Sequence, residues 1–133
     1  MVWLDTAGNG AAGSIYYELR FTNLSSSPCT MHGYPGVSAI DLQGRALGSP
    51  AARSSGNVKT KAVTLSAGAT ASATLRIVQA GNFPEEKCGL RTAAGLRVYP
   101  PNDRASRLVP FPFAACARRA PRFLEVGPVR PGL

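Results

Sequence analysis

The chain has 133 residues, of which 44% are hydrophobic and 17% charged, with 14 glycines and 11 prolines. Its apolar content excludes a disordered chain, its length fits one domain, and its glycine and proline content argues against a helical bundle. No apolar stretch approaches the length of a membrane-spanning helix. The chain has 15 lysines and arginines and 7 aspartates and glutamates, which give a net charge of +8. This charge is consistent either with binding to an anionic partner or with basic side chains spread evenly over the surface.

The first half of the chain predicts short strands separated by turns. Residues 14–23 alternate between apolar and polar side chains, which predicts a strand with one face in the core. The apolar side chains of this strand are Ile15, Tyr17, Leu19 and Phe21. Further strands are predicted over residues 29–32, 37–42 and 45–48, the last two forming a hairpin. Residues 49–57 are rich in Ser, Ala and Gly and predict a loop.

The second half continues this pattern. Strands are predicted over residues 58–65 and 70–78, and an irregular stretch with a short helical turn at 84–88 follows. In the strand over 70–78, we expect four side chains to face inward: Ala71, Ala73, Leu75 and Ile77. The remaining strands are predicted around residues 96–98 and over 108–113 and 123–129. Prolines in the last two indicate edge positions or bulges.

With residues 29–32 and 37–42 counted as one strand that a turn interrupts, these segments make about seven or eight short strands. Their turn signals, about every 8–12 residues, predict an all-β fold. We expect an immunoglobulin-like antiparallel β-sandwich that forms a single domain over residues 1–133. A small closed barrel is the competing architecture.

Three cysteines are present, Cys29, Cys88 and Cys116, and none forms a C-x-x-C motif. An odd count fits one disulfide and one free thiol, and the spacing alone does not identify the pair. We expect Cys88 and Cys116 to pair because both lie at the ends of irregular segments. Cys29 lies in a strand-like apolar run, and we expect it to be a buried free thiol.

Several segments of the chain resemble one protein family. The most specific is C-T-M-H-G-Y-P-G-V at residues 29–37, and weaker likeness is found at residues 10–14, 19–23, 65–68 and 96–101 and at the late Cys116. Over about residues 8–130 the chain resembles the actinobacterial family called domain of unknown function 4232, found in secreted proteins and lipoproteins. The resemblance implies an exported, non-enzymatic β-sandwich and implies no ligand.

The first residues show no basic segment followed by an apolar segment, so no signal peptide is visible. Together with the resemblance, this leads us to expect an extracellular or cell-envelope domain whose signal peptide or lipid anchor lies outside these residues.

Residues that could support catalysis are few. His32 is the only histidine, and strand alternation puts it on the opposite face from Cys29, which disfavours a Cys–His pair. The adjacent Glu85 and Glu86 lie beside a turn and favour a solvated end over a glycosidase pair. No glycine-rich loop precedes a predicted helix. We therefore expect no enzyme and no cofactor.

A metal site has only weak candidates. Cys29, Met31 and His32 are soft ligands of the kind that Cu(I) prefers, but alternation leaves only Cys29 and Met31 on one side of the strand. The family resemblance also makes position 31 ordinarily a core aliphatic residue, for which methionine is a routine substitute.

The turn at residues 33–36 has a structural and a functional interpretation. Structurally, Pro35 fixes one backbone angle, Gly36 permits a positive φ, and Tyr34 packs over the sheet. Functionally, Tyr34 and Pro35 could anchor a partner or a sugar ring. The single tryptophan, Trp3, likewise either holds the first strand or forms a surface contact.

Three function classes remain. The favoured one is a non-catalytic extracellular binding domain whose partner is a protein or a cell-envelope polymer. The second is a secreted proteinase inhibitor that presents Arg104 or Arg107 from the loop at residues 100–107. A nucleic-acid binder is the weakest, because no strand combines aromatic and basic residues as RNA-binding domains do, and we expect no specific nucleic acid.

The basic charge is concentrated late in the chain. Residues 91–133 hold eight arginines against only Asp103 and Glu125. If the strands of this region pair in one sheet, the charge gathers on one side, and weak, salt-sensitive attraction to anionic polymers is expected.

Overall fold

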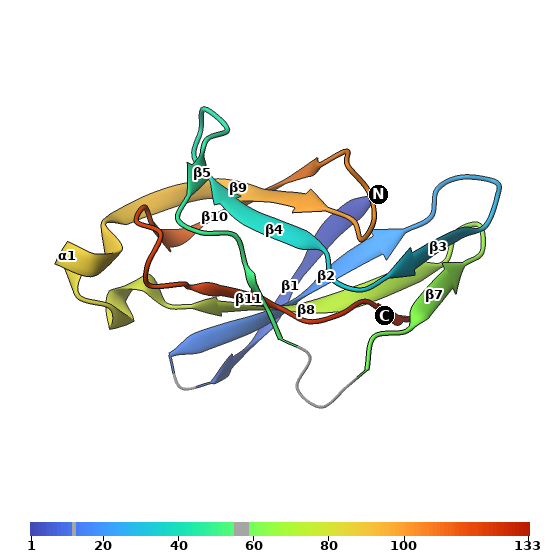
Figure 1. Cartoon of the computed structure of the whole chain (residues 1–133), viewed down its shortest axis with the longest axis horizontal. Helices are drawn as coiled ribbons and strands as arrows, with labels where there is room; N and C mark the ends of the chain where they lie inside the picture. The colour runs from blue at the N-terminus through green and yellow to red at the C-terminus, as the bar shows by residue number, and fades with distance from the viewer. Residues whose placement is uncertain (12, 55–58) are drawn as a thin grey trace.

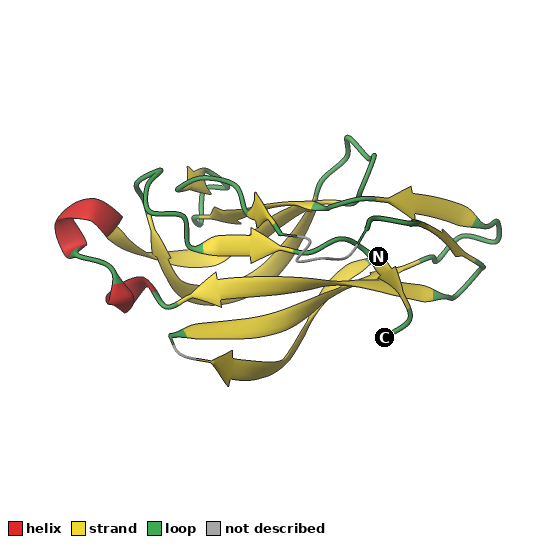
Figure 2. Cartoon of the chain, turned by 60° about the horizontal axis from the view of Figure 1, so that its bottom comes forward, coloured by secondary structure: helices red, strands yellow, loops and turns green. Residues whose placement is uncertain are grey.

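Two β-sheets packed face to face dominate the part of the chain that the structure describes (Figures 1 and 2). This computed structural model describes residues 1–11, 13–54 and 59–133. The all-β fold class predicted from the sequence is confirmed. No helix in these residues has the length and apolar character needed to cross a membrane.

The larger sheet has six strands, with β12 paired to β8 beside the main order β1-β2-β8-β11-β6. Their bounds are β1 (Val2–Ala11), β2 (Ser14–Thr22), β8 (Thr70–Val78), β11 (Leu124–Val126), β6 (Ala52–Arg53) and β12 (Arg130–Pro131). The second sheet has the order β10-β9-β4-β5, with β10 (Arg107–Cys116), β9 (Leu90–Tyr99), β4 (Gly36–Ile40) and β5 (Ala46–Leu47). A two-stranded sheet of β3 (Cys29–His32) and β7 (Ala62–Leu65) extends one end of the molecule, and η1 (Ala80–Asn82) and α1 (Glu85–Cys88) lie toward the other (Figure 1).

The core forms between the inward faces of β2 and β8 and those of the second sheet. As predicted, Leu19 and Phe21 of β2 are buried, and they pair in register with Ala73 and Ala71 of β8. Large side chains on one strand thus lie beside small ones on the next, which lets the opposite sheet pack closely. The other large, fully buried side chains include Leu75, Leu96, Val37, Val98, Phe123 and Val126. Each contributes roughly 1.5–3 kcal/mol by leaving water.

Three strands lie where the sequence predicts none: β1, β6 and the two-residue β12, which follows the predicted strand at 123–129. β1 has no apolar alternation because a run of small and polar residues fills its centre, and its register with β2 shifts between Asp5 and Asn9. β6 has only two residues, within the predicted loop at 49–57, and forms through its parallel pairing with β11. Such long-range pairing leaves no local signal. Val58, the first residue of the predicted strand at 58–65, lies outside the described residues, and β7 begins at Ala62.

The prolines of β10 behave as the sequence predicts. β10 is an edge strand, and its register with β9 shifts between Pro110 and Phe113, which marks a bulge. At this bulge β10 runs very close to Gly95 of β9. A Cβ atom at position 95 would lie 2.3 Å from the carbonyl oxygen of Val109, so only glycine fits there.

The disulfide between Cys88 and Cys116 is confirmed. It joins the last residue of α1 to the last residue of β10, and both half-cystines are buried. Backbone hydrogen bonds from Ala117 to Gly89 (2.9 Å) and from Arg118 to the Cys88 carbonyl (3.1 Å) continue this link. The irregular stretch after β8 is therefore fixed to the second sheet.

Two sequence predictions about individual residues are wrong. Cys29 is a free thiol, as expected, but it is exposed, because β3 pairs only with β7 in a sheet that projects from the sandwich. The positive φ of the turn at 33–36 belongs to Gly33 (101°) and not to Gly36. Gly36 begins β4, where a Cβ would meet Tyr99 at an ordinary 3.5 Å.

Replacing Gly95 with alanine is expected to lower the free energy of unfolding by about 1–3 kcal/mol, because β10 must move away from the added methyl group. Gly10→Ala is the matched control, since Gly10 also lies in a strand and a Cβ there has no neighbour within 4 Å. Urea unfolding of both variants measures the difference. Equal stability of the two variants would contradict the close approach of β10.

Removing the disulfide with Cys88→Ala and Cys116→Ala together is expected to cost roughly 3–4 kcal/mol of unfolding free energy, from the added entropy of the unfolded chain. Cys29→Ala, which removes the exposed free thiol, should change stability by less than about 0.5 kcal/mol. Thermal and urea unfolding test both, and peptide mapping without reductant that found Cys29 in a bridge would refute the pairing.

Candidate functional site

The weak metal candidates lie together on β3 but on different sides. Met31 is half-buried against the core, and Cys29, on the same side as alternation predicts, is exposed. His32 faces the opposite side, where its Nε2 and the Thr60 hydroxyl share a hydrogen bond of 3.1 Å. Among residues 1–11, 13–54 and 59–133 there is no group of three or more His, Cys, Asp and Glu side chains that could hold a metal ion.

The turn residues Tyr34 and Pro35 have different environments. Pro35 is fully buried and belongs to the core, which fits the structural interpretation. Tyr34 is half-buried, and the guanidinium carbon of Arg53 lies 5.4 Å from the centre of its ring. Tyr34 lines a polar cleft of about 290 Å³, which we call the donor cleft. Its other side chains are His32, Arg53, Thr60 and Asn102.

The two arginines proposed for a proteinase contact are not equivalent. Arg107 is the first residue of β10 and pairs with Val98. Its guanidinium donates hydrogen bonds to the carbonyls of Ala105 and Ser106 (3.1 and 3.3 Å), so it stabilises its own loop. Arg104 has an exposed side chain in the same loop.

The strands of the arginine-rich late region do not pair in one sheet, so the condition for a basic surface on one side of the molecule is not met. β9 and β10 belong to the four-stranded sheet, whereas β12 pairs with β8 in the six-stranded sheet. Arg97 donates a hydrogen bond to the Gly44 carbonyl (2.7 Å), and Arg130 forms an ion pair with Glu18. The late arginines therefore divide between the two sheets, and four of them have side-chain partners nearby: Arg97, Arg107, Arg122 and Arg130.

Four of the seven carboxylates form ion pairs with arginine: Asp5 with Arg20, Asp41 with Arg45, Glu125 with Arg76 and Glu18 with Arg130. The hydrogen bond from Arg20 (2.8 Å), followed by one from the Ala7 amide, lowers the pKa of Asp5. Backbone amides, first that of Arg45 and then that of Gln43, lower the pKa of Asp41. The lowered pKa values keep Asp5 and Asp41 ionised at neutral pH, which suits ion pairing and not proton transfer.

Asp5 and Arg20 also belong to a network on the outer face of the six-stranded sheet. Arg20 donates to the hydroxyl of Ser72 (2.7 Å), which in turn donates to the Gly132 carbonyl (2.7 Å). Ser72 alternates with the inward-facing Ala71 and Ala73 and so lies on the outer face of β8, but the network buries it completely. Trp3 stacks near Arg20 (5.9 Å) and donates to Thr22 (3.2 Å), so it holds the first strand in place.

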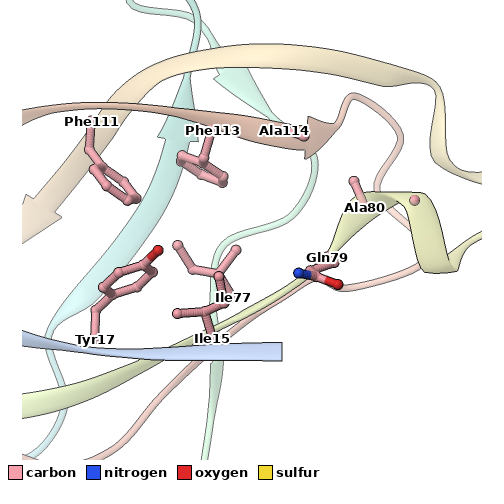
Figure 3. A pocket seen from close by; sticks show the side chains of 9 residues that line it. Ile15, Tyr17, Ile77, Gln79, Ala80, Phe111, Phe113 and Ala114 are labelled. Carbon is pink, nitrogen blue, oxygen red and sulfur yellow. The ribbon is translucent and has the colours of Figure 1, made fainter. Parts of the chain in front are cut away.

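A cavity of about 320 Å³ opens between the two sheets beside η1 (Figure 3). One wall is formed by Ile15 and Tyr17 of β2 and Ile77 of β8, and the facing wall by Phe111 and Phe113 of β10. The remaining lining residues are Ala114 of β10 and residues 79–81, at and beside η1. Figure 3 shows the rings of Tyr17, Phe111 and Phe113 on facing walls, with Gln79 to one side.

The aromatic side chains of this cavity contact one another but are not covered. Tyr17 and Phe111 meet edge to face with ring centres 5.1 Å apart, and Phe111 stacks on Phe113 at 5.8 Å. Both phenylalanines are half-buried, whereas the neighbouring inward residues of β10, Val109 and Ala115, are fully enclosed. The opposite sheet thus does not fill the space over the two rings.

Sequence reasoning missed this cavity. The segment Pro110-Phe111-Pro112-Phe113 carries a signal, because two aromatic residues alternate with two prolines on an edge strand. An edge strand that is rich in aromatic residues and cannot pair further is a suitable place for an exposed apolar surface. The facing residues Ile15 and Ile77 could be located only from the pairing of β2 with β8.

A second apolar groove lies on the outer face of the four-stranded sheet. It includes Ile40, the exposed Leu42 and Leu108, and Pro110. All of its lining residues belong to this sheet and its β4–β5 hairpin, so no second wall encloses it.

Comparison with known protein families identifies the family of this chain. A family model described as "Domain of unknown function (DUF4232)" matches residues 2–130, nearly the whole chain. No curated protein and no solved structure matches the chain.

The Asp5–Arg20 ion pair is expected to make stability depend on acid pH. Because the folded chain lowers the pKa of Asp5 below 3.8, the contribution is present above about pH 3.8 and is lost as the pH falls through the folded pKa. Asp5→Asn should therefore be less stable than wild type at neutral pH and lose less stability on acidification. Glu86→Gln, which alters an exposed carboxylate outside the four ion pairs, is the control. Urea unfolding at neutral and acid pH measures this, and parallel acid profiles of wild type and Asp5→Asn would refute it.

Proposed function

The chain belongs to the family described as domain of unknown function DUF4232, and we propose that it is a non-catalytic, exported binding domain whose ligand site is the cavity between its two sheets. The observation that carries this proposal is the pair of half-buried phenylalanines, Phe111 and Phe113, facing an unfilled apolar space. A cavity of this kind is the usual form of a small-molecule site.

Export is supported by the Cys88–Cys116 disulfide. Structural disulfides form and persist in oxidising compartments such as the cell envelope and the extracellular space. A non-catalytic role is supported by the partners of the titratable groups: the only histidine bonds a threonine hydroxyl, and most carboxylates are held by arginine or by backbone amides.

The lining residues indicate the chemistry of the ligand. Isoleucine, phenylalanine and alanine side chains form most of the cavity, and the polar side-chain groups are the Tyr17 hydroxyl and the Gln79 amide. Among the described residues that line the cavity, none is charged. A charged group would lose its hydration there without compensation. We therefore propose that the part of the ligand that enters the cavity is neutral and apolar.

The free edge of β10 favours a small molecule over an extended peptide. A peptide that binds by strand addition needs a continuous row of backbone donors and acceptors on an edge strand. Pro110 and Pro112 lack N–H groups, and the bulge at these residues breaks the register of β10. These features block strand addition at the wall of the cavity.

The proteinase-inhibitor alternative stays a prediction. Of the two candidate arginines, Arg107 holds its own loop through hydrogen bonds to Ala105 and Ser106, which leaves Arg104 to enter a proteinase pocket. An inhibition assay against a trypsin-like proteinase, with Arg104→Ala as the matched variant, tests this alternative.

A neutral apolar fluorophore, N-phenyl-1-naphthylamine, is expected to bind the wild-type domain saturably and to be displaced by decanol. Ile15→Trp places an indole inside the cavity, because the Ile15 side chain points into it (Figure 3), and should weaken binding by at least about tenfold, which corresponds to 1.4 kcal/mol. Ala105→Trp, at an exposed loop position away from the cavity, is the matched control and should bind as wild type does.

Fluorescence titration measures these affinities, and circular dichroism checks that each variant is folded. Phe113→Ala, which removes part of one wall, should also weaken binding. Absence of saturable binding to wild type, or equal affinity of Ile15→Trp and wild type, would overturn the proposal.

A further inference from the structure

We propose that the donor cleft is a second binding site, which holds an oxyanion, a carboxylate or a phosphate, carried by a hydroxyl-rich molecule such as a sugar acid or a polyol phosphate. The proposal rests on the convergence of the Arg53 guanidinium with the hydroxyl, amide and imidazole groups of Tyr34, Thr60, Asn102 and His32. It is independent of the apolar cavity.

Four separate segments build the donor cleft: residues 32–34, Arg53, Thr60 and Asn102. His32 ends β3, Tyr34 lies in the turn before β4, Arg53 is in β6, and Asn102 lies in the loop between β9 and β10. Thr60 precedes β7. A cleft formed by segments so far apart in sequence depends on the tertiary fold and is not a property of one loop.

Specific contacts fix the side chains at their places. The Asn102 amide donates a hydrogen bond to the His32 carbonyl (3.3 Å), and Asn102 has a φ of 66°, a left-handed conformation that asparagine tolerates. His32 and Thr60 are joined by their hydrogen bond of 3.1 Å. The Tyr34 ring lies 5.4 Å from the guanidinium carbon of Arg53 and orients it through a cation–π contact.

Arg53 has a charge that no carboxylate of the described residues neutralises by an ion pair. The four ion pairs of the described residues use Arg20, Arg45, Arg76 and Arg130. Residues 12 and 55–58, which the structure does not describe, include no aspartate or glutamate. The described residues that line the cleft also include no carboxylate. The charge of Arg53 is therefore available to a ligand.

The chemistry of these groups favours an oxyanion. The planar guanidinium presents parallel N–H donors that match the two oxygens of a carboxylate or a phosphate. The second amide hydrogen of Asn102 and the hydroxyls of Thr60 and Tyr34 can serve the remaining oxygens or the hydroxyls of a sugar or polyol. Lys59 and Lys61, both exposed beside Thr60, add a positive potential that attracts the anion.

The test measures binding of three probes to the whole domain by isothermal titration calorimetry and ligand-observed NMR: inorganic phosphate, glucuronate and glycerol 1-phosphate. Glucose and glycerol are the neutral controls. Saturable binding of at least one anionic probe is expected, and a preference for glucuronate or for glycerol 1-phosphate distinguishes a sugar acid from a polyol phosphate. Raising NaCl from about 0.02 to 0.2 M should weaken binding by screening.

Arg53→Ala should lower the affinity at least about tenfold, because it removes the charge-assisted hydrogen bonds. Arg119→Ala removes the same charge from an exposed side chain outside the cleft and should stay within about twofold of wild type. Arg53→Lys, which keeps the charge but loses the planar fork, should bind with intermediate affinity.

Three results would overturn the proposal. The first is no binding of any anionic probe to wild type at about 10 mM, a concentration that detects even weak complexes. The second is an equal loss in Arg53→Ala and Arg119→Ala, which indicates general charge attraction. The third is binding of glucose as tight as that of glucuronate, which indicates a site that recognises hydroxyls and not an anion.

Discussion

The pairing of β2 with β8 is the constraint on which the rest of this structure depends. The two strands pair over nine positions without a register shift, so every side chain on both strands has a fixed face. Toward one end, the inward faces carry Leu19, Phe21, Ala71 and Ala73, which the second sheet covers to form the core. Toward the other end, the same faces carry Ile15 and Ile77, where the second sheet leaves the cavity. One alternation therefore produces both the core and the proposed ligand site.

The outer face of the same ladder explains where much of the basic charge is neutralised. Arg20, Arg76 and Arg130 lie on this face, and each has a carboxylate partner there. Ion pairs at such a surface add little stability, but they hold the C-terminal segment against β8. The positive charge that carboxylates do not neutralise therefore belongs to basic residues outside this outer face. One of them, Arg53, lies in a cleft that is rich in hydrogen-bond donors. The distribution of partners, and not the number of arginines, indicates where an anion can bind.

The sequence predicts those parts of the fold that depend on local pattern. Strict alternation located β2 and β8, and prolines identified β10 as an edge strand with a bulge. The sequence could not locate β6 because it exists only through pairing with a strand more than seventy residues later. The apolar neighbours of Cys29 in the sequence predict that its side chain is buried. Burial depends instead on whether a second sheet covers the strand, and Cys29 is exposed. Both proposed sites combine segments far apart in sequence, and for that reason only single members such as Tyr34 could be found beforehand.

The two proposed sites lie in different parts of the sandwich and use different physics. The cavity lies beside η1, and the donor cleft lies between β3 and the β9–β10 loop, toward opposite ends of the long axis in Figure 1. No residue lines both sites. Sites without shared partners usually respond independently to substitution. Loss of apolar binding in a cavity variant should therefore leave anion binding unchanged, and a variant that loses both has lost the fold that positions them, because the β2–β8 ladder and the core between the sheets support both ends.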